Sequence, residues 1–136
     1  MKRTASAHWE GDLKTGKGTV STQSTVLNQT QYSFSTRFED GVGTNPEELL
    51  AAAHAGCFTM AVSSALGRAG FTPASLDTVA TLTMENLAVT GIHLAIKGAV
   101  PGITAEQFAA VTKGAEENCI ISKALSVPIT SEASLV

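Results

Sequence analysis

Two cysteines, Cys57 and Cys119, are the side chains of this sequence best suited to nucleophilic or redox chemistry. Cys57 lies in an apolar stretch, where a cysteine is commonly inert packing. Cys119 precedes a predicted short turn, and a thiol at a helix N-terminus has a lowered pKa, so Cys119 has its own claim to be the more reactive sulfur. No Cys-x-x-Cys pair or Cys/His cluster indicates a zinc site.

A buried cysteine needs a nearby positive charge to react, because the thiolate is the nucleophile. Only three arginines occur, and Arg37 is the one that stands shortly before the apolar stretch of Cys57. The segment QYSFSTRF, residues 31–38, alternates as a strand does and could lie against that stretch. The alternative position for Arg37 is a solvated strand face, where arginine is usually found.

The stretch from residue 44 to 67 predicts the long helix that would position Cys57. Thr44 or Asn45 can cap its N-terminus, and Pro46 suits the first helical position, where no N–H is needed. Beyond this first turn, apolar residues occupy nearly every side, which is typical of a helix buried all round.

Two carboxylates, Glu47 and Glu48, fall in the electropositive first turn of this helix. Glu47 could fix the aim of the Arg37 guanidinium by a bidentate contact. Decoration of the helix dipole is the alternative role, and Glu48 satisfies it equally well.

The same helix is about as long as a bilayer span, but polar residues such as His54 and Thr59 interrupt it and aromatic anchors are missing from its ends. We therefore expect a buried helix and no membrane as partner. A formal charge of −3 without a Lys/Arg run argues against nucleic acid. The N-terminal residues lack the apolar run of a signal peptide, so we expect a cytoplasmic protein, in which two cysteines indicate redox or catalytic use.

The remaining chain alternates between strand and helix patterns. Period-two alternation predicts strands over residues 4–9, 17–24, 31–38, 76–84, 92–100 and 127–135. The residues between the strands 76–84 and 92–100, which include Gly91, allow a hairpin. Thr104 and Gln107 form a capping box that opens a second helix, residues 105–117. This order predicts a single α+β domain, residues 1–136, with a largely antiparallel sheet.

Structural roles are favoured over catalytic ones for the three histidines. His54 is on the same side of the long helix as Cys57 and could be a base, but a hydrogen-bonded core histidine is favoured. His93 lies between Ile92 and Leu94 and faces away from them, and His8 looks structural.

Several motifs together carry a resemblance. The run TNPEELLAAAHAGCFTMA, with AHWEGDLKTGKGTVST, TRFEDGVG, AGFTP and ENCIISKAL, resembles the osmotically inducible protein C (OsmC) family, within the group that includes organic hydroperoxide resistance proteins. The resemblance covers nearly the whole chain. Many relatives have proline after the second cysteine, where this sequence has Ile120.

The resemblance implies a thiol-dependent peroxidase that reduces organic hydroperoxides, and hydrogen peroxide less efficiently. Cys57 would be the peroxidatic cysteine, Cys119 the resolving cysteine, and Arg37 with Glu47 the pair that activates Cys57. No cofactor is expected beyond an external dithiol reductant. The implied fold has antiparallel sheets wrapped around a long central helix in an intertwined homodimer, with two active sites at the interface.

Helix geometry adds a constraint on this arrangement. Ten residues separate Glu47 from Cys57, so on one straight helix they are ~15 Å apart and cannot share a site. The activating pair must therefore act across chains. Two antiparallel copies of the helix that cross near Ala52 would place Glu47 of each chain opposite Cys57 of the other.

Apolar side chains expected near the site would favour alkyl hydroperoxides; these are Phe34, Phe38, Phe58 and Met60. Two other functions remain open: a non-enzymatic module whose apolar cleft binds a ligand, and a thiol-based redox sensor. A cysteine hydrolase is disfavoured because no convincing Cys/His/Asn set emerges.

Overall fold

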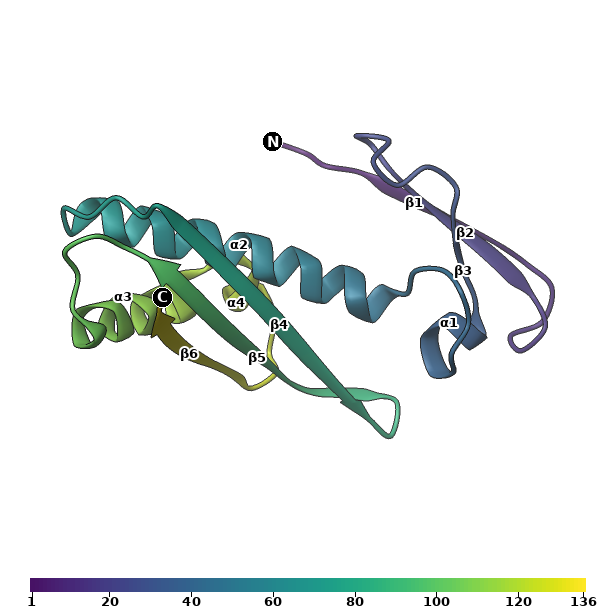
Figure 1. The fold of residues 1–136 in the computed structure, drawn as a ribbon. Coiled ribbons are helices and arrows are strands. Elements are labelled where there is room, and N and C mark those ends of the chain that lie inside the picture. Colours follow the sequence, from purple (N-terminus) through teal and green to yellow (C-terminus); the bar gives the residue numbers. More distant parts are fainter. The chain divides into compact units, whose positions relative to one another are not determined.

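The computed structural model describes residues 1–136 and divides into two compact units, Met1–Leu49 and Leu50–Val136. Figure 1 shows the order of their elements along the chain. The long helix α2, Pro46–Arg68, begins in the first unit and continues into the second.

The first unit contains a three-stranded antiparallel sheet in the order β1-β2-β3 (Figure 1). Its strands are β1 (Ala5–Glu10), β2 (Lys17–Thr22) and β3 (Thr30–Tyr32). Gly18 lies between Trp9 and Tyr32 in the register, and a Cβ there would come within 2.6 Å of each ring. The missing side chain lets the two rings approach to 5.5 Å between centroids.

The predicted strand over residues 31–38 is wrong in its second half, where residues Phe34–Phe38 form the short helix α1. Ser33 caps α1: its Oγ accepts the Thr36 N–H, and Thr36 Oγ1 accepts the Ser33 N–H at 2.8 Å. This capping box satisfies backbone donors locally and so competes with strand pairing. Arg37 is therefore on a helix and not on a strand face.

The start of α2 agrees with the sequence prediction, and Asn45 is the capping residue. Its Oδ1 accepts the Glu48 N–H at 2.7 Å. By length and apolar composition, α2 also meets the requirements of a membrane span.

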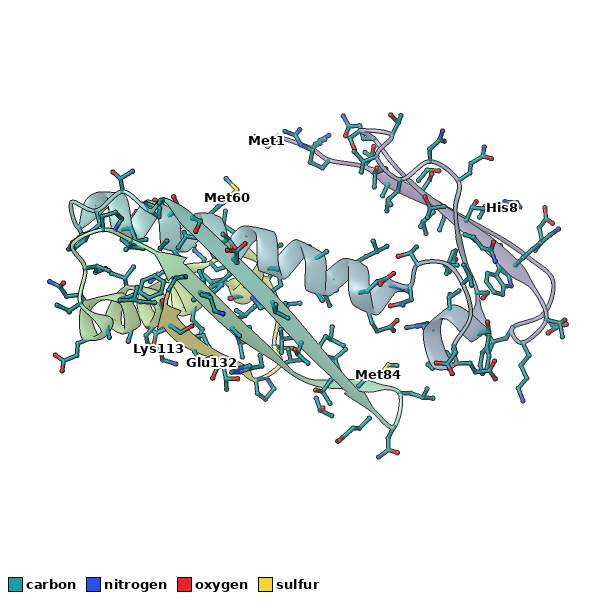
Figure 2. The ribbon with its side chains drawn as sticks, viewed as in Figure 1. Met1, His8, Met60, Met84, Lys113 and Glu132 are labelled. Atoms are coloured by element: carbon teal, nitrogen blue, oxygen red, sulfur yellow. The ribbon has the colours of Figure 1, made fainter.

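Within the single chain, α2 is not buried all round as predicted. Its buried side chains are His54, Phe58, Val62 and Leu66, a spacing of four that makes one stripe. Other apolar positions remain open; Met60, for example, is 75% exposed and projects away from the helix (Figure 2). Exposed apolar patches are typical of surfaces that bind a partner.

The second unit contains the sheet β4-β5-β6. Strands β4 (Ser75–Glu85) and β5 (Ala88–Ala99) form the predicted antiparallel hairpin, and its turn is Asn86 and Leu87, both with positive φ. Strand β6 (Ile129–Leu135) pairs parallel to β5 and is the exception, because the other strand pairs are antiparallel as the prediction of a largely antiparallel sheet requires. The chain returns to the sheet through two helices, which is the kind of crossover that parallel pairing needs.

Those helices are α3 (Ala105–Asn118) and α4 (Ile120–Ala124). The predicted capping box opens α3: Thr104 Oγ1 accepts the Gln107 N–H, and Gln107 Oε1 accepts the Thr104 N–H. Helices α2 and α3 cover the same face of the sheet (Figure 1), and their inward side chains form one core with β5. Its fully buried members include Phe58, Leu66, Leu94, Ile96, Phe108 and Cys119.

Candidate functional site

The two cysteines lie next to each other in the second unit. Cys57 is in the middle of α2, and Cys119 is the residue between α3 and α4, where it caps the N-terminus of α4. Their Sγ atoms are 3.1 Å apart, and both thiols are free. This separation is about 1 Å longer than a disulfide bond, so a small shift of either side chain would join them.

The two sulfurs differ in access. Cys119 is 1% exposed and belongs to the core, whereas Cys57 is only half-buried. A reagent that arrives from solvent therefore meets Cys57 first.

The more accessible thiol, Cys57, is the less acidic of the two. Burial and the neighbouring Cys119 thiol raise the pKa of Cys57, and the backbone amides of Ile121 and Ile120 offset this only in part. Burial also raises the pKa of Cys119, but the backbone amide of Ser122 and the Cys57 thiol outweigh it, and the pKa of Cys119 is lowered. Within the second unit, the proton is therefore lost more easily from Cys119.

His54 is completely buried beside this pair, as its expected role as a hydrogen-bonded core histidine requires. Its Nε2 lies 2.7 Å from Ser122 Oγ on α4, while its Nδ1 has no hydrogen-bond partner. Burial lowers the pKa of His54, so the ring is neutral at pH 7. Ser122 is not among the residues predicted from the sequence, although its position three residues after Cys119, at a predicted helix start, was a usable signal.

The other two candidate residues form an ion pair in the first unit. Arg37 Nε of α1 lies 2.7 Å from Glu47 Oε1 in the first turn of α2. The guanidinium carbon lies 5.2 Å from the centre of the Phe38 ring, and Phe34 packs against Phe38. One Arg37 nitrogen makes the contact, so the expected bidentate geometry is absent and the remaining guanidinium N–H groups are free for another anion.

The two glutamates of the first turn have different roles. Glu48 Oε1 accepts a hydrogen bond from Thr44 Oγ1 at 2.8 Å, whereas Glu47 pairs with Arg37. The second oxygen of Glu47 is buried without a partner. The structure thus separates a carboxylate that holds a cation from one that serves the helix start, which the sequence pattern left open.

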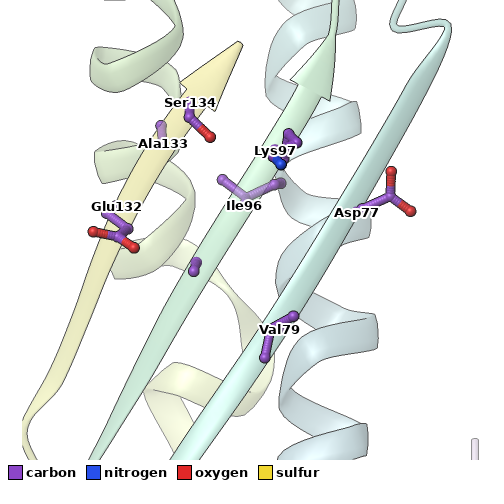
Figure 3. A pocket seen from close by; sticks show the side chains of 8 residues that line it. Asp77, Val79, Ile96, Lys97, Glu132, Ala133 and Ser134 are labelled. Atoms are coloured by element: carbon purple, nitrogen blue, oxygen red, sulfur yellow. The ribbon is translucent and has the colours of Figure 1, made fainter. Parts of the chain in front are cut away.

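A hollow on the second sheet is separate from the cysteines. It lies over the outer face of the three strands (Figure 3), where its lining includes Asp77, Val79, Ala95, Lys97, Glu132 and Ser134. The cysteines pack with the core on the opposite face. His93 is also on the outer face, as predicted, with Nδ1 2.7 Å from Thr130 Oγ1.

The aromatic and sulfur side chains expected to line a site for alkyl groups differ in their exposure to solvent. Phe58 is fully buried in the core and lines no opening. Phe38 is 36% exposed and Met60 is 75% exposed. No three His, Cys, Asp or Glu side chains converge in a way that could hold a metal ion.

Comparison with protein families and curated proteins gives consistent matches. The family model described as OsmC-like protein matches residues 38–133. The chain is 53% identical over 133 residues to "Peroxiredoxin OsmC" of Escherichia coli (strain K12), and the match covers 95% of this chain and 93% of that protein. The protein of the same name from Shigella flexneri matches equally.

Solved structures show the same fold at low sequence identity. An OsmC-like protein of unknown function from Vibrio cholerae superposes with a TM-score of 0.75 at 18% identity, over 98% of this chain and 99% of the other. The organic hydroperoxide resistance protein of Bacillus subtilis superposes with a TM-score of 0.65 at 20% identity, over 98% of each chain.

Proposed function

This chain belongs to the OsmC family, and we propose that it is a thiol-dependent peroxidase that reduces organic hydroperoxides through Cys57 and Cys119. Its curated relatives at 53% identity are named as peroxiredoxins, and the match extends over nearly the whole length of both proteins. The observation that carries the assignment of the two residues is the distance of 3.1 Å between their sulfurs.

The reaction has two steps at these sulfurs. The Cys57 thiolate attacks one peroxide oxygen, the O–O bond breaks, and the alkoxide takes a proton and leaves as the alcohol, so that Cys57 becomes a sulfenic acid. The Cys119 thiolate then attacks the Cys57 sulfur, the S–O bond breaks, and the oxygen leaves as water. An external dithiol reduces the resulting disulfide by exchange.

Access and proximity divide the roles between the cysteines. Cys57 is half-buried and open to a peroxide, while Cys119 is in the core and already within reach of Cys57. A sulfenic acid on Cys57 would therefore meet a thiol before it meets a second peroxide molecule.

Cys57 needs a cation, because burial and the Cys119 thiol raise its pKa. The ion pair of Arg37 and Glu47 is the candidate source, with guanidinium N–H groups free beyond its one contact. Glu47 lies ten residues before Cys57 on the same helix, ~15 Å along its axis, so we assign this role to the pair of a second chain.

A homodimer with antiparallel α2 helices would bring the two pairs together. The exposed apolar positions of α2, such as Met60, support such a covering surface. Small residues at 51–53 would permit the helices to cross closely. Each site would then combine Cys57 and Cys119 of one chain with Arg37 and Glu47 of its partner.

The preference for organic hydroperoxides rests on apolar groups near the ion pair. The Phe34 and Phe38 rings are 4.9 Å apart between centroids and flank Arg37 on α1. In the proposed dimer they would offer an alkyl group an apolar surface beside the cation, which hydrogen peroxide cannot use.

Peroxide addition to the reduced protein tests this function. One equivalent of cumene hydroperoxide should consume both thiols of each chain and release cumyl alcohol, and a dithiol should support many turnovers. Unchanged thiol content would contradict the proposal and leave ligand binding as the function. A single oxidation that a dithiol reverses without sustained turnover would instead identify a sensor.

A further inference from the structure

A buried hydrogen bond joins α2 to α4, the short helix that follows the resolving cysteine. Neither of its two residues takes part in the proposed reaction. His54 and Ser122 are 0% and 8% exposed, and Nε2 of the ring lies 2.7 Å from the serine hydroxyl. His54 is one turn before Cys57 on α2, and Ser122 is three residues after Cys119 on α4. The contact therefore joins the two segments that carry the reacting sulfurs.

We propose that His54 and Ser122 are positioning residues: the Nε2–H of His54 donates to Ser122 Oγ, and the hydroxyl proton of Ser122 is thereby directed at the sulfur of Cys119. This inference rests on the proposed peroxidase function, because it assigns the relay to the step in which Cys119 attacks Cys57. The relay acts through Cys119 and touches no substrate.

The hydrogen bonds available to His54 indicate that Nε2 carries the proton and donates to Ser122. Neutral imidazole has one N–H and one lone pair, and Nδ1 of His54 is buried without a partner. If Nδ1 carried the proton, it would be a buried donor without a partner, and Nε2 would accept the hydrogen bond of the Ser122 hydroxyl. A proton on Nε2 leaves just a lone pair unsatisfied and frees the hydroxyl proton for the neighbouring sulfur.

Ser122 is three residues after Cys119, in the first turn of α4. The Ser122 hydroxyl, together with the backbone amides of Ser122 and Ile121, opposes the effect of burial and lowers the pKa of Cys119. The titratable group that acts on this sulfur is Cys57, whereas Glu116 of α3 is engaged by Lys113 and Ser131. The relay thus supplies a donor to a thiolate whose pKa no cation of its own chain lowers.

The relay serves both directions of the disulfide step. A lowered pKa increases the fraction of Cys119 that is thiolate and can attack the sulfenic acid, with one proton from solvent completing the water that leaves. When a dithiol later attacks the Cys57 sulfur, Cys119 leaves as the thiolate, and a leaving thiol of lower pKa leaves faster.

The pKa of Cys119 can be measured without any peroxide, from thiolate absorbance near 240 nm in a Cys57→Ser background. Ser122→Ala should raise this pKa by about one, the worth of a hydrogen bond to a charged group. His54→Leu should raise it as well, whereas His54→Gln keeps an N–H donor at the same reach and should restore most of the effect.

The double variant separates a relay from ordinary packing. If His54 acts through Ser122, His54→Leu combined with Ser122→Ala should raise the pKa no further than Ser122→Ala alone. In the Cys57-containing protein, Ser122→Ala should slow disulfide formation about threefold below the pKa, because a tenfold loss of thiolate is partly offset by greater nucleophilicity.

The outcomes are distinct from failure of the peroxidase proposal. An unchanged Cys119 pKa in Ser122→Ala overturns the relay even if the enzyme turns over normally. Additive shifts in the double variant also overturn it. The expected shift in a protein that consumes no peroxide would support the relay and contradict the peroxidase function. Should His54→Leu fail to fold, Ser122→Ala and His54→Gln still decide the matter.

Discussion

The Sγ atoms of Cys57 and Cys119 lie 3.1 Å apart, although 62 positions of the sequence separate the two residues. The long helix α2 supplies one sulfur, and the junction of α3 and α4 supplies the other. Because both thiols are free at this distance, the pair is already arranged for disulfide formation without unfolding of either helix.

Serine variants separate the roles of the cysteines. Cys57→Ser should abolish reaction with peroxide, because the remaining thiol is 1% exposed. Cys119→Ser should keep a single oxidation and accumulate a sulfenic acid, which dimedone would trap as a mass increase on Cys57. Equal peroxide consumption by Cys57→Ser would reverse the assignment in favour of Cys119.

Loss of the cation should slow the first step. Arg37→Gln is expected to reduce the rate constant of Cys57 oxidation about 100-fold, a typical effect of removing one preorganised donor. Arg37→Lys should recover only part of it, because lysine lacks the planar fork of donors. Stopped-flow measurement with cumene hydroperoxide would give these rates.

Glu48→Gln is the matched control for this test. The Glu48 carboxylate accepts a hydrogen bond from Thr44 and makes no contact with Arg37, so Cys57 of this variant should be oxidised at the original rate. Glu47→Gln, which changes the carboxylate held by Arg37, should slow oxidation. Equal rates in Glu47→Gln and Glu48→Gln would remove Glu47 from the site.

Ile120→Pro tests why this chain departs from the proline of many relatives. Cys119 has φ −58° and ψ 132°, a conformation compatible with a following proline, and residue 120 is the first position of α4. The backbone of Cys119 should accept the substitution, but the gain of about 0.5 kcal/mol through the unfolded chain should be offset by loss of the Ile120 amide beside Cys57, so the net change in stability should be small.

The same substitution has a chemical effect. The amide of Ile120 lowers the pKa of Cys57, so its loss should raise that pKa and slow peroxide attack at neutral pH. Thermal unfolding and the pH profile of oxidation measure the two effects. A loss of about 3 kcal/mol or more, as for proline in a helix interior, would show that the turn does not accept proline.

Glu116 should give folding stability a pH dependence. Glu116 is 6% exposed, and burial raises the pKa of its carboxyl group. Hydrogen bonds from Lys113 and Ser131 outweigh this effect and lower the pKa below its ordinary value of 4.5. A lowered folded pKa means that the stabilisation is complete above pH 4.5 and is lost as pH falls through the folded pKa.

Glu116→Gln should therefore destabilise the protein by about 1 kcal/mol at pH 7 and show a smaller decline in melting temperature below pH 4.5. Glu117→Gln, at the exposed neighbouring position, should retain the original decline. Parallel acid profiles of the original protein and Glu116→Gln would contradict the role of this carboxylate.

The sequence predicted the elements that have strong local signals. Asn45 and Pro46 located the start of α2, and Thr104 with Gln107 located the start of α3. The segment around Arg37 was misread because Ser33 and Thr36 form a capping box inside an alternating pattern. Local polar contacts there outweigh periodicity.

Properties that depend on other segments could not be read from the pattern. The parallel pairing of β6 follows from the path of α3 and α4, not from its own residues. Ser122 joins the site because α4 packs beside His54, a contact between positions 68 residues apart. The resemblance supplied the pairing of Cys57 with Cys119, which spacing alone did not determine.

The central claim is that Cys57 and Cys119 of one chain form the disulfide of a peroxidase cycle. Its most direct test is titration of the fully reduced protein with cumene hydroperoxide, followed by mass analysis of non-reduced peptides. The account predicts loss of both thiols at one equivalent and a peptide pair joined through Cys57 and Cys119. Thiols that persist, or an oxidised Cys57 with Cys119 still free, would contradict it.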